Sequence, residues 1–196
     1  RDRSVSRGLG DVYKRQKYIR SLELKKNRKA EKVFLAEGPK LVGDLLGHFD
    51  CCFLIATAEW LSAHRQLPVE DVNEVSEEEL SRASLLKTPQ QVLAVFRQPD
   101  EVLDVSVINR SLCLALDDVQ DPGNLGTIIR LADWFGIEHI FCSPNTVDVY
   151  NPKAIKATMG GIARVKLHYT PLPELIGSLK DIPVSVSYTH LTLPTI

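Results

Sequence analysis

Apolar residues recur along the first half of the chain with periods that alternate between helix and strand. Short apolar runs are typical of buried strands, and apolar residues three or four positions apart indicate amphipathic helices. Ser76 followed by Glu79 predicts a capping box at the start of one helix. Predicted strands cover residues 33–38, 51–57 and 91–96, and predicted helices cover 17–31, 39–46, 58–65 and 76–84. We therefore expect a small sheet flanked by helices.

In the second half of the chain, predicted strands and helices alternate more regularly. The run "SLCLALDDV" is almost continuously apolar, which is typical of strands buried in parallel sheets. Predicted strands cover residues 111–119, 139–143, the end of 151–169 and a segment that begins at Ile182, and predicted helices cover 125–135, the start of 151–169 and 172–180. This order predicts a parallel sheet with right-handed crossovers.

The two ends do not continue these patterns. The chain begins at Arg1, its only methionine is Met159, and neither end shows a sustained amphipathic period. We interpret both ends as non-native tails, translated adapter or cloning sequence beside an incomplete reading frame. The expected division is a tail over residues 1–16, a first domain over 17–97, a linker over 98–104, a second domain over 105–185 and a tail over 186–196.

Composition narrows the class of protein. The chain has 196 residues, of which 44% are hydrophobic, and a net charge of −1. That length allows one medium domain or two small ones with cores of their own. No apolar run approaches the roughly 20 residues that span a bilayer, and no secretory signal is evident. We therefore expect a cytoplasmic protein that is not associated with a membrane.

Candidate metal ligands are sparse. The four cysteines, Cys51, Cys52, Cys113 and Cys142, form no C-x-x-C pair, so we expect small buried hydrophobic side chains and no metal site.

The charged residues are distributed unevenly along the chain. Basic residues are concentrated in 17–32 and acidic residues in 70–79. These clusters fit two solvated helix faces, or alternatively a basic patch that meets phosphates.

The most informative stretch is "DDVQDPGNLGTIIRLADWFG", residues 117–136. Pro122 and Gly123 predict a turn, and Asn124 is expected to cap the following helix. Gly126 is expected to keep the first turn open, so that backbone N–H groups can face an anion. Gly136 is well placed to end the helix. The buried face is expected to consist of Leu125, Ile128, Ile129, Ala132 and Phe135.

Polar residues of the same stretch suggest a site. Arg130 and Trp134 lie one turn apart on the expected exposed side, with Thr127 beside them. An ordinary helix with an exposed arginine would be enough to explain Arg130, Trp134 and Thr127. It would not explain why Asp118, Asn124 and Arg130 should gather at the carboxyl end of a buried strand, where open α/β sheets bind ligands. The stretch lacks the motifs of phosphate-binding P-loops and dinucleotide folds.

These residues resemble a known family. "DDVQDPGNLGTIIRLADWFGI" and "NPKAIKATMGGIARV" are similar to motifs of the SpoU/TrmH family of RNA ribose methyltransferases, in the knotted SPOUT class. "FLAEGPKLVGDLL" and "LLKTPQQVLAVF" resemble the substrate-binding domain that precedes many such catalytic domains. The resemblance implies an α/β protein in which a small ribosomal-protein-like α/β RNA-binding domain precedes an incomplete SPOUT (α/β knot) parallel-sheet domain.

The resemblance also implies a reaction and residues for it. Family members transfer a methyl group from S-adenosylmethionine to a ribose 2′-hydroxyl of tRNA or rRNA, usually as homodimers. Asn124 and Arg130 fall on active-site positions, and Arg130 would hold the target phosphate. For Asn124, capping and a direct catalytic role both stay open. Lys153 and Lys156 would meet RNA phosphate, or alternatively only solvent. Trp134 would stack on RNA or on an arginine, or alternatively lie in a dimer interface.

One departure limits this expectation. The family forms its cofactor pocket and knot from a later G-N-E-G stretch and an S-L-N-V-A-type helix start, and this sequence contains neither. We therefore expect no cofactor-binding residues, no methyl transfer and no trefoil knot in the chain as it stands. Two alternatives remain: a non-catalytic RNA-binding protein of the same architecture, and a small nucleotide-binding α/β protein.

Overall fold

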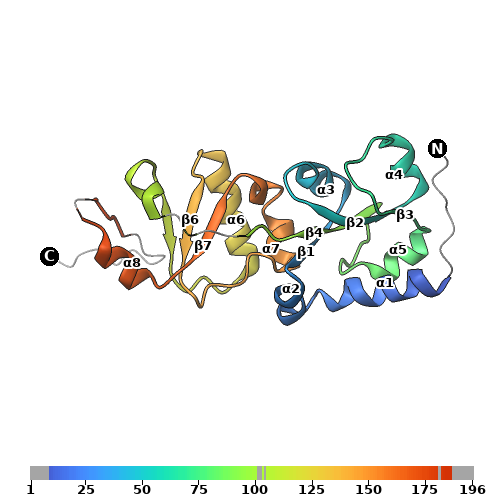
Figure 1. Ribbon diagram of the computed structural model, residues 1–196, viewed down its shortest axis with the longest axis horizontal. Coiled ribbons are helices and arrows are strands. Elements are labelled where there is room, and N and C mark those ends of the chain that lie inside the picture. Colours follow the sequence, from blue (N-terminus) through green and yellow to red (C-terminus); the bar gives the residue numbers. More distant parts are fainter. Residues whose placement is uncertain (1–8, 101–102, 104, 181, 187–196) are drawn as a thin grey trace.

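The computed structural model describes residues 9–186, except 101–102, 104 and 181, and describes side chains from Tyr13 onward. It contains two sheets that lie one after the other along the long axis of the molecule (Figure 1). The expected tails lie mostly outside the described residues, and the expected linker lies partly outside them. Every helix in the described part of the chain is too short or too polar to cross a membrane.

The first sheet belongs to a unit that we call the N-terminal unit, residues 9–97. Its strands lie in the order β1-β4-β2-β3, in which β4 is antiparallel to both neighbours and β3 is parallel to β2. Its helices are α1 (Leu9–Ser21), α2 (Lys25–Glu31), α3 (Pro39–Leu45), α4 (Ala58–Ala63) and α5 (Glu77–Ala83). Its strands are β1 (Val33–Glu37), β2 (Cys51–Ala56), β3 (Val72–Glu74) and β4 (Val92–Arg97).

Two features of this unit differ from the prediction. The helix predicted over residues 17–31 is two helices, because the chain turns between Ser21 and Lys25, and α1 begins already at Leu9. Arg15 and Gln16, which fall in the expected tail, contact the unit: Arg15 pairs with Asp71 at 2.7 Å, and the Gln16 amide donates to a carbonyl of α5. The short strand β3 was not predicted. The capping box of Ser76 and Glu79 is confirmed.

The second sheet belongs to a unit that we call the C-terminal unit, residues 105–186. Its strands lie in the order β5-β6-β7 and are all parallel, as predicted. The strands are β5 (Leu114–Leu116), β6 (His139–Cys142) and β7 (Lys166–Tyr169). The helices are α6 (Pro122–Trp134), α7 (Pro152–Ala157) and α8 (Leu172–Ser178), with 3-10 turns at Val105–Asn109 and Gly161–Ala163.

Two predicted strands of this unit are wrong in extent. Strand β5 has three residues instead of the nine predicted and is only half-buried, because it pairs with one neighbour, β6. Residues 182–186 form no strand. Pro183 lacks a backbone N–H to donate to a sheet, and the described strands pair with one another and not with this segment.

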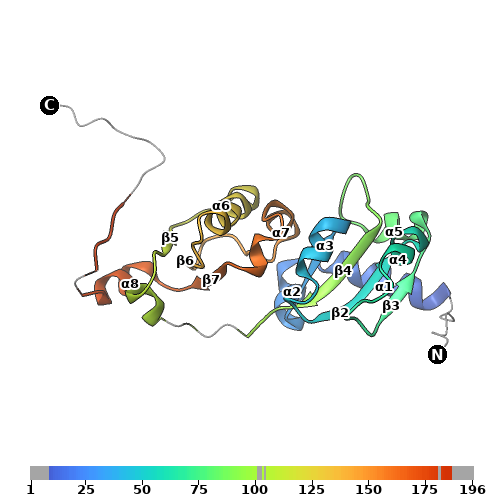
Figure 2. The same cartoon turned by 90° about the horizontal axis from the view of Figure 1, so that it is seen from above.

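The two units share one hydrophobic core. It joins side chains of the first sheet, such as Phe34 and Phe96, to Tyr150 and Ile155 of the C-terminal unit. The rings of Phe34 and Tyr150 are in tilted contact, with centroids 5.2 Å apart. Figure 2 shows α7 between α6 and the N-terminal unit, and α7 contacts β1. The short helix α7 therefore connects the two units physically.

Candidate functional site

Helix α6 begins earlier than predicted. Asp121 is the N-cap, and its carboxylate accepts a hydrogen bond from the Asn124 backbone N–H at 2.7 Å. Pro122 takes the first helical position, where its fixed φ suits the helix and its missing N–H costs nothing. The prediction that Asn124 caps the helix is therefore wrong. The Asn124 side chain is exposed and makes no hydrogen bond to another described residue.

Gly126 does not serve the predicted purpose either. It is buried against α7, where a Cβ atom would lie 2.4 Å from Ala157 Cβ and 2.6 Å from the Ala154 carbonyl oxygen. Those distances are far below van der Waals contact. Gly126 is therefore required so that α6 and α7 can approach closely, and not to open the helix start to a ligand.

The faces of α6 mostly follow the predicted pattern. Leu125, Ile129 and Ala132 are buried and Ile128 is partly buried, but Phe135 is 73% exposed. Phe135 is the C-cap residue of the helix, whose last helical residue is Trp134. Gly136 ends the helix as predicted, with a φ of 70°.

Arg130 and Asn124 are both exposed but are not adjacent. They are six residues apart on one helix, which places them about 9 Å apart along the axis and about 120° apart around it. Asp118 lies in the loop after β5, where its N–H donates to Ser143 and its carboxylate accepts from Gln120. A ligand that contacts both α6 side chains must therefore be extended, as a polynucleotide is.

The surroundings of Arg130 contain a second arginine. Gly161 lies against α6, where a Cβ atom would be 3.5 Å from Arg130 Cα. Arg164 follows and forms two hydrogen bonds of 2.7 Å to Asp133, which raise the pKa of Arg164 above its usual value. Arg130 has no ion-pair partner among the described residues. Sequence reasoning missed the pair of Arg164 and Asp133 because its members are 31 residues apart.

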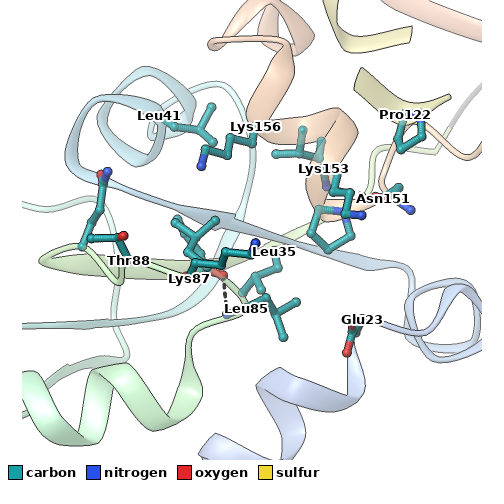
Figure 3. Close-up of a pocket in the computed structure, with 15 residues that line it drawn as sticks. Glu23, Leu35, Leu41, Leu85, Lys87, Thr88, Pro122, Asn151, Lys153 and Lys156 are labelled. Carbon is teal, nitrogen blue, oxygen red and sulfur yellow. Dashed lines mark hydrogen bonds between the residues drawn. The ribbon is translucent and has the colours of Figure 1, made fainter. Parts of the chain in front are cut away.

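A pocket of about 710 Å³ lies between the two units (Figure 3). Lys153 and Lys156 of α7 line one part of it, and Lys87 of the loop before β4 lines another. Neither Asn124 nor Arg130 belongs to its lining. The structure thus separates the predicted residues into an exposed side of α6 and an inter-unit pocket. Sequence reasoning missed Lys87, which is distant along the chain from both other lysines.

Glu37, at the end of β1, also lines this pocket. Its carboxylate accepts hydrogen bonds from the Ser84 hydroxyl and, at 2.9 Å, from the Leu85 backbone N–H. Burial raises the pKa of Glu37 above its ordinary value, although these hydrogen bonds and the charge of Lys156 act in the opposite direction. The pocket therefore combines three ammonium groups with two carboxyl groups, the partly buried one of Glu37 and the exposed one of Glu23.

No group of three or more histidine, cysteine or acidic side chains that could hold a metal ion occurs in the part of the chain that the structure describes. The four cysteines form no disulfide. The candidate site therefore consists of basic, amide and carboxyl side chains.

Comparison with known proteins gives two family matches. Residues 14–94 match the MRM3-like substrate binding domain, and residues 111–193 match the SpoU rRNA Methylase family. The chain is 30% identical over 174 residues to the 23S rRNA (guanosine(2553)-2′-O)-methyltransferase RlmP of Bacillus subtilis, an alignment that covers 88% of this chain and 68% of that protein.

Solved structures of similar proteins support the same family assignment. A putative RNA methyltransferase of the TrmH family from Porphyromonas gingivalis is 39% identical, with a TM-score of 0.71, over 84% of this chain and 63% of that one. An AdoMet-bound rRNA methyltransferase from Sinorhizobium meliloti is 31% identical, with a TM-score of 0.70, over 88% of this chain and 66% of that one. The chain thus spans about two thirds of the length of these relatives, and it belongs to the SpoU rRNA methylase family.

Proposed function

We propose that the protein to which this chain belongs transfers a methyl group from S-adenosylmethionine to a ribose 2′-hydroxyl of ribosomal RNA. The observation that carries the proposal is the exposed Arg130 on α6, which has no ion-pair partner in the described part of the chain and lies within the stretch that matches the SpoU family. In the same proposal, residues 17–97 bind RNA, residues 98–104 link the domains, and residues 105–185 belong to the methyltransferase domain.

Arg130 binds the phosphate beside the target ribose. A guanidinium stays charged at any physiological pH and offers phosphate two parallel donors. The same property makes Arg130 a poor general base, so its role is to position the ribose oxygen in line with the methyl donor. Asn124 is released from capping by Asp121, and its amide is free to hydrogen-bond the same RNA strand one helical turn or more away.

S-adenosylmethionine supplies the methyl group in this family, and the Sinorhizobium relative was solved with it bound. The inter-unit pocket is lined by three lysines and two glutamates, and the sequence lacks the G-N-E-G and S-L-N-V-A-type segments that form the cofactor pocket in this family. We therefore assign the described residues to the RNA side of the reaction only. The absence of methyl transfer by the chain as it stands stays a prediction.

The test is methyl transfer to ribosomal RNA by the complete protein, whose reading frame is established by sequencing the source DNA beyond the codon for Val184. Methylation of a 2′-hydroxyl blocks alkaline cleavage at that position, so the expected product is a radiolabelled, alkali-resistant dinucleotide. Arg130→Ala should lower the rate at least about a hundredfold, whereas Arg110→Ala, at an exposed arginine outside the proposed site and the proposed RNA-binding residues, should not change it.

Two outcomes would contradict the proposal. Label in alkali-labile positions would show that a base and not a ribose is modified. RNA binding without transfer by the complete protein would favour the non-catalytic alternative, which the three-lysine pocket could also serve.

We also propose a cytoplasmic homodimer. Leu131, Trp134 and Phe135 are 49%, 84% and 73% exposed and follow one another along the end of α6. An exposed apolar patch of this kind is typical of interaction surfaces. Light scattering should give twice the monomer mass for the complete protein, and Trp134→Glu should return it to the monomer mass.

A further inference from the structure

We propose that the inter-unit pocket binds one unstacked guanosine nucleotide of the RNA, next to the nucleotide that is methylated and distinct from it. The proposal rests on the proposed function in so far as the nucleotide belongs to ribosomal RNA. It is carried by the composition of the pocket, its position relative to Arg130, and its construction from both units.

The charge of the pocket selects an anion. Lys153 and Lys156 are three residues apart on α7, so they lie on one face of the helix. Lys87 reaches the pocket from the loop before β4, as Figure 3 shows. None of the three lysines forms an ion pair with another described residue. These three ammonium groups outnumber the two carboxylates of the lining, Glu23 and Glu37, so the cavity favours a phosphate group.

The rest of the pocket suits a nucleobase. Leu85, Leu86 and Pro152, which are partly buried, provide an apolar wall, with the buried side chains of Leu35, Leu41 and Ile155 also in the lining. Single-stranded RNA is commonly recognised by bases that leave the stack, pack on such surfaces and hydrogen-bond through their edges. A volume of about 710 Å³ lies within the range of pockets that enclose small ligands.

Glu37 gives the pocket a preference among bases. A carboxylate has about four lone-pair positions, of which the Ser84 hydroxyl and the Leu85 N–H occupy two, one on each oxygen. One acceptor position on each oxygen remains. Guanine offers two adjacent donors, its N1–H and its exocyclic amine, to such a pair of acceptors. Adenine and cytosine place an acceptor nitrogen beside their amine, which a carboxylate repels.

The nucleotide in the pocket is not the methylated one. The pocket lining includes neither Asn124 nor Arg130, and Gly126, which lies between them in the sequence, is buried against α7. A strand that contacts both sites must cross from α7 to the exposed side of α6. The pocket therefore fixes the register of the RNA by holding a neighbouring nucleotide.

The experiment uses the 196-residue chain with ¹³C-labelled leucine and isoleucine methyl groups, followed by NMR. Guanosine 5′-monophosphate should shift the methyl signals of Leu35, Leu41, Leu85 and Ile155 saturably, and inorganic phosphate alone should shift them much less. Replacing Lys153 and Lys156 together by alanine should weaken guanosine monophosphate binding at least about tenfold. Lys166→Ala, at an exposed lysine of β7, should change it less than about twofold.

Base preference is tested separately with Glu37→Gln, which keeps the size of the side chain. The chain should bind guanosine monophosphate more tightly than cytidine monophosphate, and the variant should lose most of that difference. Unchanged preference in a variant with a native-like spectrum would overturn the role of Glu37. Methyl shifts that map outside the pocket, or equal effects of the α7 variant and Lys166→Ala, would overturn the site.

Failure of this inference and failure of the proposed function are distinguishable. If the complete protein methylates ribosomal RNA but the pocket does not bind guanosine monophosphate, only the inference is wrong. If the pocket binds it and the complete protein does not methylate RNA, the proposed reaction is wrong and the nucleotide site stands.

Discussion

Asp121 and Asn124 show how two neighbouring polar residues acquire different roles. Either type of side chain can cap a helix, and the sequence pattern predicted Asn124 as the cap. Pro122 decides the matter, because a proline at the first helical position places the cap one residue before it. The Asn124 amide is then left exposed, which is compatible with a role in binding.

We predict that Asp121→Ala lowers the free energy of unfolding by about 0.5–2 kcal/mol, because the Asn124 N–H loses its acceptor. Asn124→Ala should change it by less than about 0.5 kcal/mol. Urea denaturation of both variants measures the difference. Equal destabilisation by the two variants would show that Asn124 contributes to the cap.

Glu37 makes stability depend on pH. Burial raises its pKa in the folded state above 4.5, so between that value and the raised pKa the folded protein holds a proton that the unfolded chain has released. The contribution of Glu37 to stability therefore falls as the pH rises through this interval. Above the raised pKa the cost of burying the carboxylate is fully present.

We predict that Glu37→Gln becomes progressively more stable relative to the wild type as the pH rises from below 4.5 to neutral. Glutamine cannot ionise, and its side chain can still accept from the Leu85 N–H. Thermal unfolding at a series of pH values measures the difference between the two proteins. A difference that is independent of pH would mean that Glu37 has an unperturbed pKa.

At the scale of elements, the contact between α6 and α7 connects the two parts of the candidate site. Helix α6 carries Asn124 and Arg130 on its exposed sides, and α7 carries Lys153 and Lys156 into the pocket. Gly126 allows the two helices to approach until Ala154 and Ala157 contact the α6 backbone. The distance between the site residues on α6 and those on α7 therefore depends on residue 126 having no side chain.

We predict that Gly126→Ala destabilises the protein by about 1–3 kcal/mol, because the new methyl group overlaps Ala157 and the Ala154 carbonyl. Gly43→Ala is the matched control: it lies inside α3 with nothing within 4 Å of the added Cβ, and it should stabilise by about 0.5–1 kcal/mol. Chemical denaturation compares them. Stabilisation by both substitutions would refute the close approach of α6 and α7.

At the scale of the whole molecule, the two units are held together by polar and apolar contacts. Arg28 of α2 is 1% exposed and donates to the carbonyls of Leu22 and Glu23 and, at 2.7 Å, to the carboxylate of Asp148 in the C-terminal unit. Asp148 precedes α7 by four residues, so this ion pair anchors the segment that leads to the pocket lysines.

We predict that Arg28→Ala lowers the free energy of unfolding by about 3–5 kcal/mol, because it leaves Asp148 and two carbonyls without their buried donor. Lys32→Ala removes the exposed pair with Asp100, which solvent screens, and should cost far less. Calorimetry of the two variants tests the comparison. Similar losses would show that Arg28 does not join the units.

The sequence by itself determined the alternation of helices and strands, the parallel second sheet, the capping box at Ser76 and the end of α6 at Gly136. These features depend on local periodicity and on residues with strong conformational preferences, which act within a few positions along the chain. The family motifs around Arg130 were visible for the same reason, because they form two continuous stretches.

Only the tertiary structure decided which residues meet across long separations. The pairs Arg28–Asp148 and Asp133–Arg164 and the contact of Gly126 with Ala157 join segments that no local pattern relates. The short β5 likewise depends on how many neighbours a strand finds, not on its own apolar residues. The pocket exists for the same reason: Lys87 and Glu37 face Lys153 and Lys156 only because a shared core packs the two units together.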